Sequence, residues 1–133
     1  MIHYVSINQP INNKKIKTYL SKNYGYIGLV SVCFPQLVFE NKHAFVEIQV
    51  CEIDKTSENP HRVLARINFS ESNEYYHNFE VNHIAWKKLD TQGRELNFYF
   101  LNEHGENIKF NDNINMTIAL LPANTEWIEK YYK

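Results

Sequence analysis

The chain has 133 residues, of which 44% are hydrophobic and 14% aromatic, and it contains 4 glycines, a composition that excludes a flexible linker or a disordered tail. Its length suits a single domain, residues 1–133, built from two packed layers. The net charge is −1, and the basic doublets at Lys14-Lys15 and Lys87-Lys88 form no positive stripe along a surface. Nucleic acid is therefore not expected as a partner.

The start of the chain and its cysteines bear on where the protein folds. Residues 1–10 lack the basic and apolar regions of a secretory leader, and no run approaches the ~18 apolar residues that a membrane span requires. Cys33 and Cys51 lie in apolar, strand-like runs, where buried free thiols are common, and no disulfide is indicated. We therefore expect folding in a reducing, intracellular environment and no contact with a membrane.

Two elements are expected in the first 24 residues. Residues 2–7 alternate as a strand, and residues 8–10 break the pattern, so residues 1–8 fit an edge strand or an N-terminal arm. Residues 16–24 fit a short helix or a loop, because three apolar side chains have helical spacing, namely Ile16, Tyr19 and Leu20.

The middle of the chain is typical of β-strands. Residues 26–34 are densely apolar and end at Pro35, which favours a buried strand. Residues 43–53 and 61–69 alternate, as strands do when one face points to solvent. Residues 75–88 fit one long strand or two, with a bulge near residues 82–83.

The most regular stretch is 94–121. Residues 96–101 alternate, residues 103–106 supply a turn in which Gly105 can adopt a positive φ, and a short and then a long strand follow. We interpret this stretch as a hairpin. Beyond it, Asn124 or Thr125 can cap a short helix, so residues 124–133 are expected to form a C-terminal helix or tail.

About eight strands at spacings of roughly 8–12 residues predict an all-β fold, an antiparallel β-sandwich. An eight-stranded jelly roll fits the strand count, and a seven-stranded immunoglobulin-like sandwich is the near alternative. The predicted core consists of the alternating apolar side chains Leu29, Val32, Phe45, Val46, Ile48, Val50, Val63, Ile67, Phe79, Val81, Leu96, Phe98, Phe100, Ile108, Phe110, Ile118 and Leu120.

The sequence offers little catalytic chemistry. Its 6 histidines form no pair at metal-ligand spacing with each other or with a cysteine, so neither a metal nor a cofactor is expected. Cys33 and Cys51 lie mid-strand, whereas a thiol nucleophile needs an exposed, electropositive strand end. A glycine-rich phosphate loop and a G-x-S-x-G elbow are both missing. We therefore expect no enzyme and no catalytic residues.

The aromatic side chains indicate binding. Aromatic faces near Asn, Asp and Glu are typical of carbohydrate sites, so a saccharide is one candidate ligand. Its candidate platform comprises Tyr24, Tyr26, Tyr75, Tyr76, Trp86, Tyr99, Trp127, Tyr131 and Tyr132. Aromatic clusters at chain ends more often contact another protein chain. The candidate interface residues are therefore Ile2, Tyr4, Trp127, Tyr131 and Tyr132.

The order of features from residue 50 to residue 121 resembles the jelly-roll capsid proteins of Polinton or Maverick elements and adintovirus-like viruses. The shared pattern is a strand ending in Cys-acidic-aliphatic, a Pro-containing loop, a Leu-x-Arg strand, an aromatic segment, and a strand, turn and strand. It covers a little over half of the chain. The matching segments are Val50–Ile53, Pro60, Val63–Arg66, Tyr75–Phe79, Leu96–Phe100, Asn102–Gly105, Ile108–Phe110 and Met116–Leu120.

This resemblance implies a structural protein of a virion, such as a minor capsid or penton-like subunit, or a protein descended from one. Its expected partners are copies of itself and other capsid proteins, and it implies no catalytic residues. The chain departs from the family at Leu121-Pro122 and in the acidic, aromatic tail that follows. A carbohydrate-binding module and an adaptor or inhibitor of a host protein are the alternatives.

Overall fold

The computed structural model describes residues 2–35, 44–68, 76–90, 94–110 and 112–123. These residues form nine strands and no helix. The strands are β1 (His3–Gln9), β2 (Ile16–Tyr19), β3 (Tyr26–Pro35), β4 (Phe45–Val50), β5 (Val63–Asn68), β6 (Tyr76–Glu80), β7 (Lys87–Lys88), β8 (Glu95–Leu101) and β9 (Ile114–Leu121).

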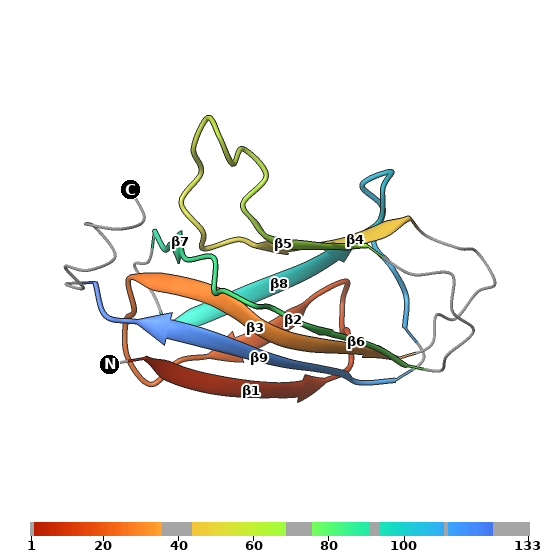
Figure 1. The fold of residues 1–133 in the computed structure, drawn as a ribbon, viewed down its shortest axis with the longest axis horizontal. Helices are drawn as coiled ribbons and strands as arrows, with labels where there is room; N and C mark the ends of the chain where they lie inside the picture. The colour runs from red at the N-terminus through yellow and green to blue at the C-terminus, as the bar shows by residue number, and fades with distance from the viewer. Residues whose placement is uncertain (1, 36–43, 69–75, 91–93, 111, 124–133) are drawn as a thin grey trace.

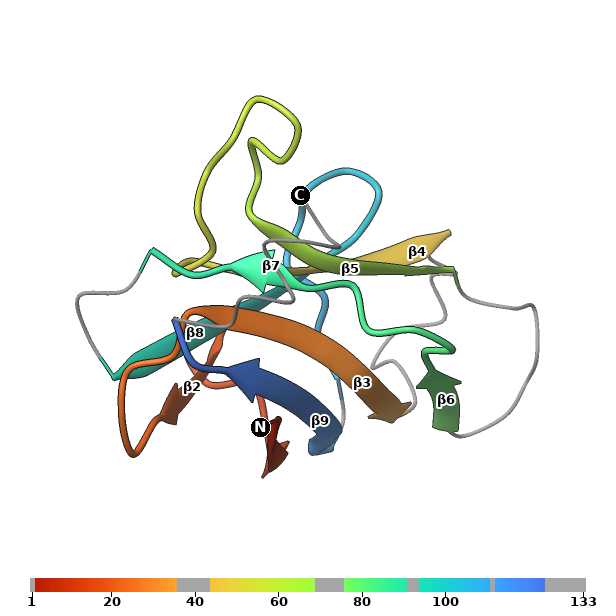
Figure 2. The ribbon, with the colours of Figure 1, turned by 60° about the vertical axis from the view of Figure 1, so that its left-hand side comes forward.

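The strands build two antiparallel sheets packed face to face (Figures 1 and 2). One sheet, here the β9 sheet, has the order β1-β9-β3-β6, and the short β7 also pairs with β3. The other, here the β8 sheet, has the order β2-β8-β4-β5. The predicted antiparallel β-sandwich is confirmed.

The pairing of the strands identifies the fold as a jelly roll. The first strand pairs with the last, β2 with β8, β3 with β6 and β7, and β4 with β5. These pairs together make one long two-stranded ribbon. The ribbon is wrapped so that β9 also pairs with β3 and β8 with β4, which generates the two sheets of a jelly roll.

The core lies between the two sheets. Phe34, Phe100 and Phe110 meet there, with ring centroids 5.3 to 6.5 Å apart. Burying a large apolar side chain contributes about 1.5–3 kcal/mol, so this layer is the main source of stability. Twelve predicted core residues are confirmed as buried: Leu29, Val32, Val46, Ile48, Val50, Ile67, Leu96, Phe98, Phe100, Ile108, Ile118 and Leu120.

The other predicted core residues, Phe45, Val63, Phe79, Val81 and Phe110, are only half-buried. A bulge explains the error in β5: Ile48 pairs with Ala65 and Gln49 with Val63, so Leu64 is the extra residue. Leu64 is buried in place of Val63.

A second bulge, between Leu29 and Ser31, changes which side chains of β3 point into the core. Leu29 and Val32 both point into the core although they are three residues apart, because the extra residue shifts the alternation. Beyond the bulge, Ser31 and Cys33 lie on the outer face of the β9 sheet.

Residues 16–24 contain a strand, so the predicted helix or loop is wrong there. Ile16, Thr18 and Leu20 are buried and the residues between them exposed, a period of two rather than 3.6. The strand is set up by a tight turn in which Asn12 and Lys15 exchange both backbone hydrogen bonds, at 2.9 and 3.2 Å. The two central residues have φ of 53° and 69°, as a two-residue hairpin turn requires.

The predicted hairpin over residues 94–121 is also wrong. β8 and β9 do not pair with each other: β8 pairs with β2 and β4, whereas β9 pairs with β1 and β3. The turn itself is confirmed, because Gly105 has φ 73° and the Asn102 side chain accepts the backbone N–H groups of His104 and Glu106. The residues after this turn therefore cross from one sheet to the other.

Both ends of the chain bear on earlier expectations. Residues 3–9 form β1, which pairs with β9 along its whole length, so most of the suggested arm, 1–8, is part of the sheet. The suggested C-terminal helix, 124–133, lies outside the described residues. Within the described ranges, no helix is long and apolar enough to cross a membrane.

Candidate functional site

On one side of the sandwich, each sheet ends in an edge strand among the described residues. β1 ends the β9 sheet and β2 ends the β8 sheet, and each pairs with one neighbour among the described strands. Only residues 10–15 separate β1 from β2, so the two strands share the same edge of the sandwich (Figure 1). We call this the β1-β2 edge. Strand edges carry unpaired backbone N–H and C=O groups that another chain can bind.

The large hydrophobic residues that are exposed in the described part of the chain lie on this edge. They are Tyr4 on β1, 56% exposed, and Tyr19 on β2, 73% exposed. Tyr4 lies on the outer face of the β9 sheet and Tyr19 on that of the β8 sheet, because their strand neighbours Ile7, Ile16 and Thr18 face the core. Tyr4 was a candidate from the sequence. Tyr19 was missed, because its segment was interpreted as a helix or loop.

The other candidate interface residues divide into two groups. Ile2 is half-buried and packs against Tyr26 and Leu121, together with Trp86, in a small cluster on the outer face of the β9 sheet. Trp127, Tyr131 and Tyr132 lie outside the described residues. An interface at these residues stays a prediction.

The aromatic residues that are described do not gather into one carbohydrate platform. Tyr24 and Tyr26 are buried, and Tyr24 stacks on the His3 ring at 5.7 Å between centroids. Trp86 and Tyr99 are half-buried and lie over different sheets. Tyr75, Trp127, Tyr131 and Tyr132 lie outside the described residues, so the aromatic platform stays a prediction.

The outer face of the β8 sheet is covered by polar side chains that bind one another. The Glu47 carboxylate accepts hydrogen bonds from Arg66 at 2.9 Å and Gln49 at 2.8 Å. Burial raises the pKa of Glu47, but these hydrogen bonds and the Arg66 charge outweigh it, so the pKa lies below its ordinary value. Arg66 also lies over the Phe45 ring, 4.4 Å from its centroid.

A second group on the same face connects β2, β8 and the end of β4. Glu52 accepts hydrogen bonds from the backbone N–H and the side-chain amide of Asn97, at 2.7 and 3.0 Å. The Asn97 amide also donates to Glu95 at 3.3 Å, and Glu95 forms an ion pair with Lys17 at 3.5 Å. These bonds connect three strands of the β8 sheet, while Asn97 Oδ1 is buried and has no hydrogen-bond partner among the described residues.

The outer face of the β9 sheet carries two rows of small polar side chains. In one row Ser6, Thr117, Ser31 and Glu80 are register partners from strand to strand. In the next row, two residues along each strand, the partners are Asn8, Asn115, Cys33 and Asn78. Register partners lie ~4.5–5.5 Å apart, so the eight side chains form a grid across all four strands.

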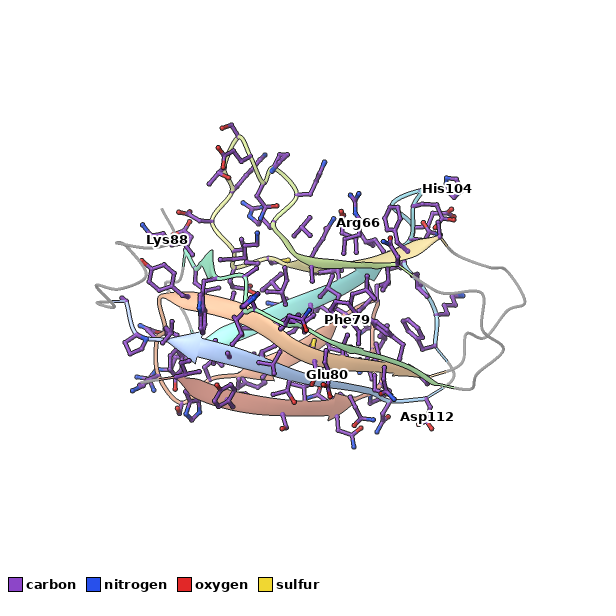
Figure 3. The ribbon with its side chains drawn as sticks, viewed as in Figure 1. Arg66, Phe79, Glu80, Lys88, His104 and Asp112 are labelled. Atoms are coloured by element: carbon purple, nitrogen blue, oxygen red, sulfur yellow. The ribbon has the colours of Figure 1, made fainter. Side chains whose placement is uncertain are left out.

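A pocket of about 240 Å³ lies over this grid. Its lining includes all eight grid residues, and Ile7, Val32, Phe79 and Met116 complete it. Phe79 and Glu80, both on β6, are labelled in Figure 3. The meeting of these side chains could not be inferred from the sequence, because the strands that carry them are far apart in the chain.

The cysteines are both free. Cys33 is half-buried in the pocket lining, and Cys51 lies just after β4 and is exposed, contrary to the expectation of a mid-strand, buried thiol. Partial burial and the neighbouring Glu52 raise the pKa of the Cys51 thiol, which disfavours the reactive thiolate. The described residues contain no group of three or more His, Cys, Asp and Glu side chains arranged to hold a metal ion.

Comparisons with known proteins return no match: no family model, no curated protein and no solved structure is similar to this chain.

Proposed function

We propose that this protein is a non-enzymatic structural subunit that assembles with copies of itself, as jelly-roll subunits of the capsid type do. The proposal takes the β1-β2 edge as the contact surface. It follows the pattern that residues 50–121 share with the capsid proteins of Polinton or Maverick elements, for which a minor capsid or penton-like role is the expectation.

The fold supports this proposal in a general way. Jelly rolls with this strand order occur in capsid subunits and in lectins, so the topology favours an assembly or a binding role. The domain closes its own core, and the surfaces left for assembly are therefore edges, loops and chain ends.

The observation that carries the proposal is the position of Tyr4 and Tyr19. Both lie on edge strands at the same edge of the sandwich, and both expose more than half of their surface. An edge strand can add backbone hydrogen bonds to a neighbouring chain, and Tyr buries a large area at small entropic cost, which makes it a frequent interface anchor. Edge strands and exposed aromatic side chains together are what a self-associating edge requires.

Sedimentation of the purified protein over a range of micromolar concentrations tests the proposal. We expect the wild type to self-associate and the double variant Tyr4→Lys/Tyr19→Lys to sediment as a monomer, because charged edges oppose strand pairing. His104→Lys is the control: His104 is exposed in a turn on the opposite side from β1 (Figure 3) and should not change the assembly.

Circular dichroism of each variant checks that the fold is kept, since both tyrosines are exposed and their loss should not unfold the domain. A wild type that stays monomeric at every concentration would contradict the proposal. So would a double variant that assembles like the wild type. A one-to-one complex with a host protein, without self-assembly, would support the adaptor or inhibitor alternative instead.

A further inference from the structure

We propose that the pocket on the outer face of the β9 sheet binds a neutral saccharide. This inference concerns the outer face of the β9 sheet, which shares β1 with the β1-β2 edge, and it does not depend on self-association. It also differs from the aromatic platform expected from the sequence, because it rests on hydrogen-bonding side chains.

The grid under the pocket has the dimensions of a small polar ligand. Four neighbouring strands span roughly 14 Å, and two rows of side chains on one face are separated by roughly 7 Å along the strands. The pocket volume of about 240 Å³ is below the roughly 300–1,000 Å³ of clefts that hold drug-sized ligands. One sugar ring is a ligand of suitable size.

The polar side chains of the grid are available for a ligand. Within the described part of the chain, none of the eight makes a side-chain hydrogen bond or ion pair, whereas their counterparts on the β8 sheet bind one another. The three Asn amides each offer two donor hydrogens and an acceptor oxygen. The hydroxyl groups of Ser6, Ser31 and Thr117 can each donate and accept a hydrogen bond.

The charges of the lining select the class of ligand. Glu80 is the one charged residue among those that line the pocket, and there is no Lys, Arg or His to hold an anion. A single carboxylate also falls short of the six or more oxygen ligands that a calcium ion needs. A sugar hydroxyl, by contrast, can donate to the Glu80 carboxylate while accepting from an Asn amide, so neutral, hydroxyl-rich ligands match this lining.

The next row along the strands bounds the pocket at one end. There Tyr4, Ala119 and Gly28 are register partners. A Cβ on Gly28 would meet the Ile84 side chain, so Ile84 lies directly over the sheet at this point, with Trp86 beside it. Phe79 is the one aromatic residue of the lining, and its side chain packs against the core on the inner side of the sheet. Because no ring of the lining residues faces the grid, we expect weak binding, with Kd in about the millimolar range.

Backbone-amide NMR shifts of the labelled protein test the inference. The probes are glucose, galactose, mannose and N-acetylglucosamine, and the comparison ligands are sialic acid and inorganic sulfate. We expect at least one neutral sugar to shift the amides of grid residues, and we expect the anions to leave them unchanged. Sugar shifts confined to other parts of the molecule, or none at millimolar concentrations, would overturn the inference, as would a response to the anions alone.

Two variants make the test specific. Glu80→Gln should weaken sugar binding about tenfold, since it removes a charge-assisted hydrogen bond. Its matched control is Glu95→Gln on the outer face of the other sheet, which should bind the sugar like the wild type. Glu80 is on β6, at the opposite edge of the β9 sheet from β1, so Glu80→Gln should leave the sedimentation of the protein unchanged. This variant therefore tests sugar binding separately from the proposed assembly.

Cys33 provides a second readout. In a Cys51→Ser background, a thiol reagent can modify Cys33 alone, and a sugar bound over the grid should slow that reaction. An unchanged rate at a sugar concentration that saturates the NMR shifts would place the ligand elsewhere and contradict the inference.

Discussion

The two outer faces of this sandwich have similar polar side chains but use them differently. On the β8 sheet Arg66 and Gln49 both donate hydrogen bonds to Glu47, and Lys17 connects through Glu95 and Asn97 to Glu52. On the β9 sheet the eight side chains of the grid make no such bonds within the described residues, and a pocket lies over them. The polar side chains of the β8 sheet are thus bonded within the structure, whereas we propose that those of the β9 sheet bind a ligand.

The largest expected effect tests whether both faces belong to one folding unit. Phe98 is fully buried under the β8 sheet, and Phe98→Ala should lower the free energy of unfolding by about 3–5 kcal/mol. Because the core is shared by both sheets, we expect a single cooperative transition in denaturant, seen alike by Trp fluorescence and circular dichroism. Two separate transitions would show that the faces belong to independent units.

A smaller effect is expected at the covered end of the β9 sheet. In Gly28→Ala the new methyl group would meet the Ile84 side chain, so residues near 84–86 must shift away from the sheet. Overpacking of this kind costs about 1–3 kcal/mol, measurable by denaturant unfolding. Ala119, the register partner of Gly28, is fully buried and provides the control: Ala119→Gly should not displace these residues.

The smallest effects compare one carboxylate from each face. Glu47→Gln should lose about 1 kcal/mol of stability at pH 7, because two side chains donate hydrogen bonds to the Glu47 carboxylate. Glu80→Gln should change stability by less than about 0.5 kcal/mol. Denaturant unfolding of the two variants measures both. Equal losses would mean that the two faces do not differ in the way proposed.

The Glu47 comparison also has a pH dependence. The folded-state pKa of Glu47 is lowered, since the hydrogen bonds from Arg66 and Gln49 outweigh the burial that raises it. Its stabilising contribution is therefore present above the unfolded pKa of about 4.3 and is lost as the pH falls through the folded pKa. The stability gap between wild type and Glu47→Gln should narrow as the pH is lowered below about 4.

The fold class could be predicted from the sequence because alternation is a local signal. Strands such as β4 and β8 show apolar residues at every second position, and their inward side chains, among them Ile48 and Phe98, are buried as expected. Errors arose where one residue changes the alternation, as at the Leu64 bulge, or where a strand is as short as β2.

Features that depend on which strands become neighbours could not be predicted. β8 and β9 look like a hairpin in the sequence because one turn separates them, but the jelly roll sends them to different sheets. The pocket grid was missed for the same reason: Asn78 and Asn115 are 37 positions apart in the chain, and only the sheet order places Cys33 between them. The exposure of Tyr4 could be inferred because residues 1–8 were expected to form an edge strand or an arm, and no such inference was made for Tyr19.

The pairing of β1 with β9 has a consequence for biosynthesis. His3 is the register partner of Leu120, so β1 has no partner in its sheet until the ribosome has added nearly all of the described residues that follow it. β2 likewise has no partner strand until β8 has been synthesised. Contacts between such distant parts of a chain form slowly, so we expect the nascent chain to keep the apolar faces of its early strands uncovered during most of translation, a period in which chaperones can bind them.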